Sequence, residues 1–186
     1  YDPHRLAAVD LATERWLTYG QFNDRATRLA AALRERFGVE HGDRVGFLAR
    51  NSTDHIEAMF ACWKLGAIFV PLNWRLSAYE MAAVVEHCEP RVVLHDEEFA
   101  PLLAQANTPG VGRRPGLAAS AYEQLIAAHD PSVAMDHVDF DTIMKYAAVT
   151  NDYNPIHVDK AFAAKSPMGG IIAHGTMSVA LIWQAL

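Results

Sequence analysis

The sequence predicts an α/β fold in which a partial parallel sheet carries packed helices, from residue 1 to about residue 134. Short apolar runs at 43–49, 67–72 and 91–96 are typical of buried strands. Amphipathic stretches alternate with these runs, and a strand–helix–strand order favours parallel pairing. The composition of the 186 residues is that of a globular protein, with 51% hydrophobic and 20% charged residues.

The first amphipathic stretch ends at a glycine. Gly38 follows the last apolar position and is the predicted C-cap of a helix. A strand over "DRVGFLA", 43–49, comes next. The apolar stripe expected on this helix consists of Phe22, Ala26, Leu29, Leu33 and Phe37.

The second amphipathic stretch, "NSTDHIEAMFACWKLG", is also closed by a glycine, Gly66. We expect its larger apolar residues to face the core, namely Ile56, Met59, Phe60 and Trp63. A buried strand over "AIFVPL", 67–72, should follow.

A capping box opens the third helix, because Ser77 and Glu80 can each satisfy the other's backbone N–H. This helix must stop before Pro90, and a strand over 91–96 follows it. Residues 105–120 are rich in Gly and Pro, which predicts a surface loop, and 121–130 predicts a short helix. The side chains expected on buried strands are Val45, Phe47, Ile68, Val70, Val92 and Leu94.

Residues 8 to about 130 resemble the start of the AMP-forming acyl-CoA synthetases, the adenylating superfamily. The matching stretches are "LTYGQF", "GVEHGDRVGFLARNS", "ACWKLGAIFVPLNWRLSAYE" and "PRVVLHDEEF". The resemblance implies that the full protein ligates a fatty or aromatic acid to CoA with ATP and magnesium. It also implies a glycine- and hydroxyl-rich phosphate loop shortly after residue 135, and no such stretch is found there. Adenylation by this chain alone is therefore not expected.

The segment 135–186 has a different character. "TNDYNPIHVD", 150–159, and "IIAHG", 171–175, precede a stretch without charged residues, Thr176–Leu186. Together they resemble the MaoC-like hot-dog hydratases, which include the (R)-specific enoyl-CoA hydratases. The resemblance implies two domains, 1–134 and 135–186, of which the second is an incomplete hot-dog segment around a buried central helix. The two are expected to join between residues 131 and 141.

Four residues of this second segment form the expected site. The resemblance makes Asp152 and His157 the catalytic pair, which would hold one water between them. The backbone N–H of Gly175 would face the thioester oxyanion, and Asn154 would order the loop. In the alternative interpretation, Asp152 only stabilises a turn, as Asp does in Asp-x-Asn-Pro sequences. Asp159 is expected to cap a helix that begins at Lys160.

Charge and cysteine content limit the partners. The net charge is -6 and no basic block stands out, so a nucleic-acid partner is not expected. No apolar run reaches the ~20 residues of a membrane span. Cys62 and Cys88 lie far apart in apolar patterns, which suits a reduced cytoplasmic protein without a metal. We expect no cofactor, an acyl-CoA thioester as substrate, and a homodimer by analogy with hot-dog proteins.

Three functions remain open from the sequence. The leading hypothesis is a lyase that hydrates trans-2-enoyl-CoA, or dehydrates 3-hydroxyacyl-CoA, with the Asp152–His157 pair. The first alternative is a fragment of an ATP-dependent acyl-CoA synthetase that lacks its phosphate loop. The second alternative is a chimera or scaffold without catalytic activity.

Overall fold

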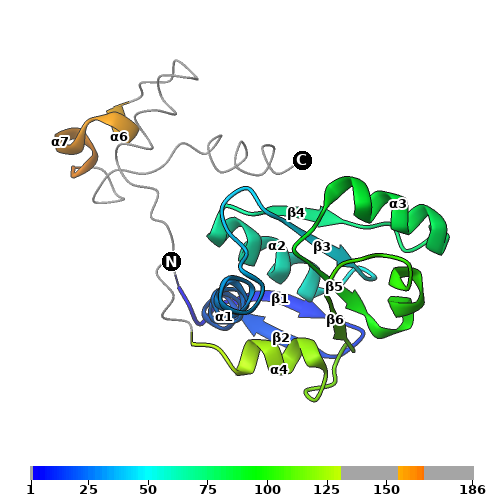
Figure 1. Cartoon of the computed structure of the whole chain (residues 1–186). Helices are drawn as coiled ribbons and strands as arrows, with labels where there is room; N and C mark the ends of the chain where they lie inside the picture. Colours follow the sequence, from blue (N-terminus) through cyan, green and yellow to red (C-terminus); the bar gives the residue numbers. More distant parts are fainter. Residues whose placement is uncertain (1, 131–154, 166–186) are drawn as a thin grey trace. The chain divides into compact units, whose positions relative to one another are not determined.

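The computed structural model describes residues 2–130 and 155–165 (Figure 1). The chain divides into two compact units: described residues 2–130 belong to the first and 155–165 to the second. In the first unit the elements follow one another as β1 (Leu6–Asp10), β2 (Arg15–Thr18), α1 (Tyr19–Phe37), β3 (Arg44–Leu48), α2 (Thr53–Leu65), β4 (Ile68–Pro71), α3 (Ala78–Cys88), β5 (Val92–Asp96), the 3-10 helix η1 (Glu97–Leu103), β6 (Gly110–Arg113) and α4 (Ala121–Ala127).

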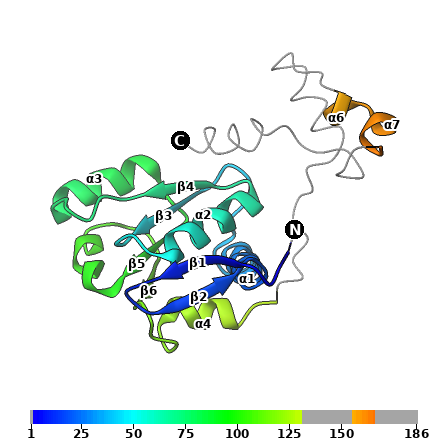
Figure 2. The ribbon, with the colours of Figure 1, turned by 180° about the vertical axis from the view of Figure 1, so that it is seen from behind.

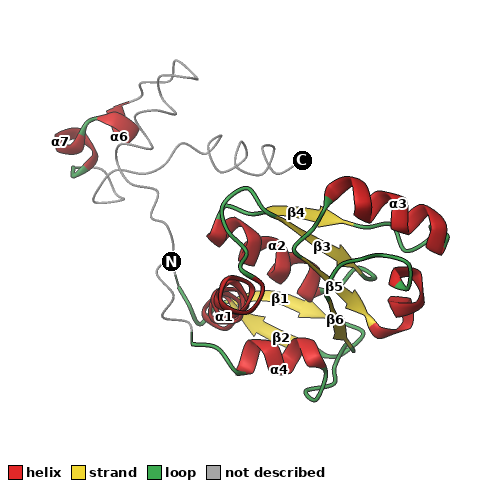
Figure 3. Cartoon of the chain, in the orientation of Figure 1, coloured by secondary structure: helices red, strands yellow, loops and turns green. Residues whose placement is uncertain are grey.

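Four of the strands form one parallel sheet in the order β4-β3-β5-β6 (Figure 3). The predicted parallel α/β fold is therefore confirmed for this unit. The register of the two central strands pairs Val45 with Val92 and Phe47 with Leu94. One strand was not predicted, because β6 lies inside the Gly- and Pro-rich segment 105–120 that we expected to be a surface loop.

Helices cover both faces of this sheet (Figures 1 and 2). On one face, buried residues of α1, α2 and α4 pack on Val45, Phe47, Val92 and Leu94, each at most 1% exposed. On the other face, residues of α3 and η1 pack on Val93. The expected strand residues Ile68 and Val70 are only half-buried, since β4 is an edge strand.

Helix α2 turns a different face to the core than its apolar pattern predicted. Ile56 and Phe60 are 42% and 40% exposed, so the expected inward stripe is wrong for these two residues. The buried face instead carries Thr53, Asp54 and Glu57 together with Ala58, Ala61, Cys62 and Leu65. The acids are tolerated inside because arginines from other elements pair with them.

The predicted helix ends agree with the structure. Gly38 and Gly66 adopt the left-handed conformation, with φ of 62° and 66°, and close α1 and α2. The capping box at Ser77 and Glu80 is present at the start of α3. A second capping box, between Thr18 and Gln21, opens α1 and was not predicted.

The antiparallel pair of β1 and β2 also went unpredicted. Its turn is held by Asp10, whose Oδ1 accepts the backbone N–H groups of Ala12 and Thr13 at 3.0 and 3.1 Å. Glu14 completes the turn with a positive φ of 54°. The strands are short and only partly buried, so their apolar pattern is weak in the sequence.

In the second unit the structure describes two single-turn helices, α6 (Pro155–Val158) and α7 (Lys160–Ala163). The predicted cap is confirmed, because Asp159 Oδ1 accepts the N–H groups of Ala161 and Phe162 at 2.9 and 3.0 Å. A hot-dog segment is not shown by residues 155–165. The expected central helix, 176–186, and the expected join, 131–141, lie outside the described residues.

None of the helices in residues 2–130 and 155–165 combines the length and apolarity that a bilayer crossing requires.

The half-buried His55 makes the stability of the first unit depend on pH. The ring of His55 contacts Phe47 and Phe69 edge-on, at centroid separations of 5.1 and 5.0 Å. Burial, followed by the positive charge of Arg113, lowers the pKa of His55 below its ordinary value of 6.5. Just below pH 6.5, His55 therefore binds a proton more readily in the unfolded chain than in the folded chain. This contribution to stability is present above pH 6.5 and is lost as the pH falls.

We expect His55→Phe to flatten the loss of stability on acidification. Between pH 7.5 and 5.5 the wild-type chain should lose up to about 1.4 kcal/mol per pH unit more than this variant, measured by urea unfolding. His87→Gln, at an exposed position of α3, is the matched control and should follow the wild type. Equal acid sensitivity of wild type and His55→Phe would contradict the prediction.

Gly46 lies in the central strand β3, where a side chain has no room. A Cβ atom at this position would lie 2.9 Å from Val93 Cγ2 and 3.3 Å from Leu72 Cδ1. Gly46→Ala should lower the free energy of unfolding by about 1–3 kcal/mol. In a Val93→Ala background the same change should cost less than half as much, because the closest methyl group, Val93 Cγ2, is gone. Denaturant unfolding of the four chains gives the coupling, and additive costs would refute the packing argument.

Candidate functional site

The carboxyl ends of β3, β5 and β6 meet at one edge of the sheet. A hollow of about 630 Å³ opens there, and its lining includes Arg50, Ser52, Asp96, Glu97, Arg113 and Arg114. In open parallel α/β sheets, ligands bind outside the carboxyl ends of the strands. This hollow is therefore the candidate functional site of the first unit.

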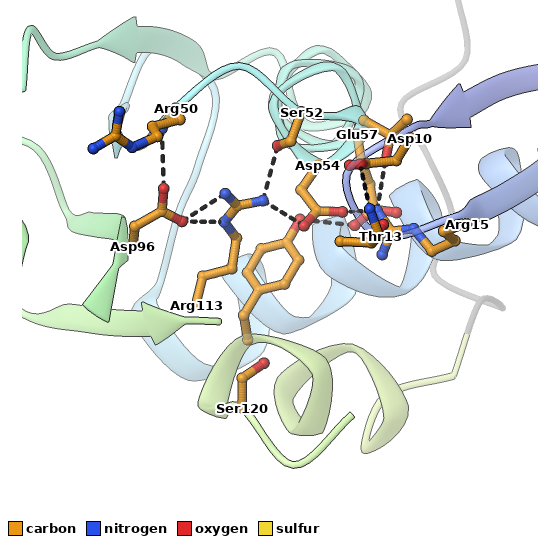
Figure 4. Close-up of polar contacts among 12 residues, drawn as sticks. Asp10, Thr13, Arg15, Arg50, Ser52, Asp54, Glu57, Asp96, Arg113 and Ser120 are labelled. Carbon is orange, nitrogen blue, oxygen red and sulfur yellow. Dashed lines mark hydrogen bonds and ion pairs between the residues drawn. The ribbon is translucent and has the colours of Figure 1, made fainter. Parts of the chain in front are cut away.

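Arg113 forms the floor of the hollow, and its side chain is only 2% exposed. The strand register places it beside Asp96, which accepts Arg113 Nε at 2.7 Å (Figure 4). A terminal nitrogen of Arg113 also donates to Asp54 Oδ2 at 2.5 Å and to Ser52 Oγ at 2.8 Å. The other oxygen of Asp96 accepts the backbone N–H of Arg50 at 3.0 Å. Arg113 thus ties the ends of β5 and β6 to the start of α2, and Asp96 links them to the chain that follows β3.

Asp54 also connects Arg113 to the β1–β2 pair. Its second oxygen forms an ion pair with Arg15 of β2 (Figure 4). Arg15 also donates to Thr53 Oγ1 at 2.6 Å and to Glu123 Oε1 at 3.2 Å. Asp54 sits in the first turn of α2, where the helix dipole favours a negative charge.

A third arginine completes the network beneath α2. Arg25 of α1 donates to both oxygens of Glu57, at 2.5 and 3.1 Å, and to both oxygens of Glu123, at 2.8 and 2.9 Å. The hydroxyl of Tyr122 donates to Glu57 Oε1 at 2.7 Å. We call Arg15, Arg25, Asp54, Glu57, Asp96, Arg113 and Glu123 the buried ion network.

Burial and pairing act against each other on the pKa values of this network. Burial disfavours the charge of Arg113, but Asp54 and Asp96 prevail and raise its pKa. The pKa of Arg25 is likewise raised, by Glu123 and Glu57, against the effect of burial. Burial raises the pKa of Glu57, while Arg25 opposes it. Arg25 and Arg113 therefore remain charged, and their ion pairs hold the geometry of the network.

The arrangement suits positioning rather than proton transfer. Each acid of the buried ion network accepts a hydrogen bond or ion pair from an arginine. Within the described ranges, no group of three or more His, Cys, Asp or Glu side chains could hold a metal ion. The network fixes the strand ends around the hollow. Its charged groups form ion pairs with one another.

A second hollow, of about 530 Å³, lies between β1, α1 and α2. Its walls are mostly apolar, with Phe22 and Phe60 in edge-to-face contact at a centroid separation of 5.6 Å. Lys64 lines it as well and donates to Asn23 Oδ1 at 2.8 Å. We call this hollow the apolar groove.

The structure does not test the site expected from the sequence. Asp152, Asn154 and Gly175 lie outside the described residues. His157 belongs to α6, where only its backbone is described. That these residues form one site remains a prediction.

The residues that the structure brings together at the sheet edge were not singled out from the sequence. Arg113 stands in the segment interpreted as a loop, and Asp54 is not one of the residues of the second helix that were expected to face the core. A signal was present for Asp96, because an acid directly follows the apolar run "VVLH" at the carboxyl end of a predicted strand. Its partner could be found only from the register of β5 and β6.

The sequence matches one known protein family and is similar to several ligases. The sequence pattern of a family described as AMP-binding enzyme matches residues 1–161. The fatty acid–[acyl-carrier-protein] ligase ScoC of Streptomyces coeruleorubidus is 29% identical over 164 residues, which are 88% of this chain and 29% of that protein. A feruloyl-CoA synthase of Amycolatopsis is 41% identical over 102 residues, 55% of this chain and 20% of the relative.

The structure resembles those of ligases as well. A fatty acyl CoA synthetase of Mycobacterium tuberculosis aligns with a TM-score of 0.62 and 28% identity, covering 71% of this chain and 27% of the other. The chain thus spans less than a third of the length of these relatives.

These comparisons correct the leading hypothesis from the sequence. The expected lyase that hydrates enoyl-CoA with Asp152 and His157 is contradicted, because the matched relatives are ligases and the family pattern extends through residue 161. Nothing in the comparisons supports a MaoC-like hot-dog hydratase joined to the first unit. The alternative of a synthetase fragment agrees better with them.

We expect Arg113→Met to destabilise the chain by about 3–5 kcal/mol, because Asp54 and Asp96 would stay buried without their shared cation. Urea unfolding measures the loss. In the triple variant with Asp54→Asn and Asp96→Asn, part of the stability should return, since no buried charge is stranded at these positions.

The matched control is Arg114→Met, the next residue along the chain. Its side chain is 61% exposed and forms an ion pair with Glu97. This change should alter the free energy of unfolding by no more than about 1 kcal/mol. Similar costs for Arg113→Met and Arg114→Met would show that the buried ion network does not stabilise the fold.

Proposed function

Since the chain belongs to the AMP-binding enzyme family, we propose that it forms the amino-terminal layer of an ATP-dependent ligase that joins a carboxylic acid to a thiol. In the proposed reaction the acid displaces pyrophosphate from ATP and becomes an acyl adenylate. The thiol then displaces AMP and keeps the acyl group as a thioester. The observation that carries the proposal is the family match over residues 1–161, which contains the whole four-stranded parallel sheet.

The described residues would contribute positioning to this reaction. The buried ion network holds the carboxyl ends of β3, β5 and β6 together beside the hollow. The 186 residues contain no glycine- and hydroxyl-rich phosphate loop of the kind that cradles nucleotide phosphates. We therefore assign the phosphate chemistry to other parts of the complete protein, and the scaffold to this layer.

The names of the relatives support a range of substrates. They include a fatty acid ligase, a feruloyl-CoA synthase and an indoleacetate–CoA ligase. We propose a fatty or aromatic acid as the acyl donor and CoA as the thiol, taken up as a substrate. A cytoplasmic site of action suits the free thiols of Cys62 and Cys88. The homodimer expected from the sequence stays a prediction.

A chimeric ligase tests the proposal. Residues 2–130 would replace the corresponding amino-terminal segment of the Amycolatopsis feruloyl-CoA synthase, with which this chain shares 41% identity over 102 residues. We expect the chimera to release pyrophosphate from ATP in the presence of ferulate and to form feruloyl-CoA, at a rate within about 10–100-fold of the parent. A misplaced scaffold can lower rates by about that much without abolishing them.

Two controls make the result decisive. The parent segment reinserted at the same junctions controls for the cutting points, and circular dichroism with thermal unfolding establishes that the chimera folds. A folded chimera that forms neither feruloyl-CoA nor dodecanoyl-CoA would overturn the proposed function. Residues 2–130 would then not support catalysis by a ligase. The 186-residue chain alone should show no ATP–pyrophosphate exchange with either acid.

A further inference from the structure

We draw no further inference here: the strongest candidate, the apolar groove between β1, α1 and α2, carries none because nothing in the described residues shows what covers it.

Discussion

The burial of Arg113 between Asp54 and Asp96 is the constraint on which the first unit depends. A guanidinium that is almost fully removed from water must have its charge matched at close range. Matching it fixes the end of β5, the end of β6 and the first turn of α2 relative to one another. The pairing of these buried charges therefore sets the geometry of the sheet edge.

The same requirement explains the orientation of α2. Asp54 and Glu57 lie on one face of the helix, and the arginines that pair with them come from the core side. Turning this face inward exposes Ile56 and Phe60, which lie on the outer side. Small residues such as Ala58 and Ala61 then allow the helix to approach the sheet closely. The helix face that carries the paired acids is therefore the buried one, and Ile56 and Phe60 stay partly exposed.

The sequence allowed the parallel sheet, the helix ends and the family of the first unit to be predicted, because these depend on local patterns. The apolar runs at β3, β4 and β5 and the caps at Gly38, Gly66 and Ser77 are local in this sense. The buried ion network could not be predicted, since its partners are separated by up to 108 residues along the chain. The motifs at 150–159 and 171–175 led to the wrong function, because the family pattern that matches residues 1–161 is that of an AMP-binding enzyme.

The parallel register gives the two borders of the sheet unequal capacity for further hydrogen bonding. Ile68 of β4 and Leu72, which follows β4, donate their N–H groups to the carbonyls of Asp43 and Phe47. The backbone nitrogens of Phe69 and Pro71 therefore point away from β3, and proline has no N–H. Just before β6, the carbonyl of Pro109 accepts the N–H of Val93, so the N–H groups of Gly110 and Gly112 point away from β5. The outer border of β6 therefore carries two N–H groups, those of Gly110 and Gly112, whereas the outer border of β4 carries only that of Phe69.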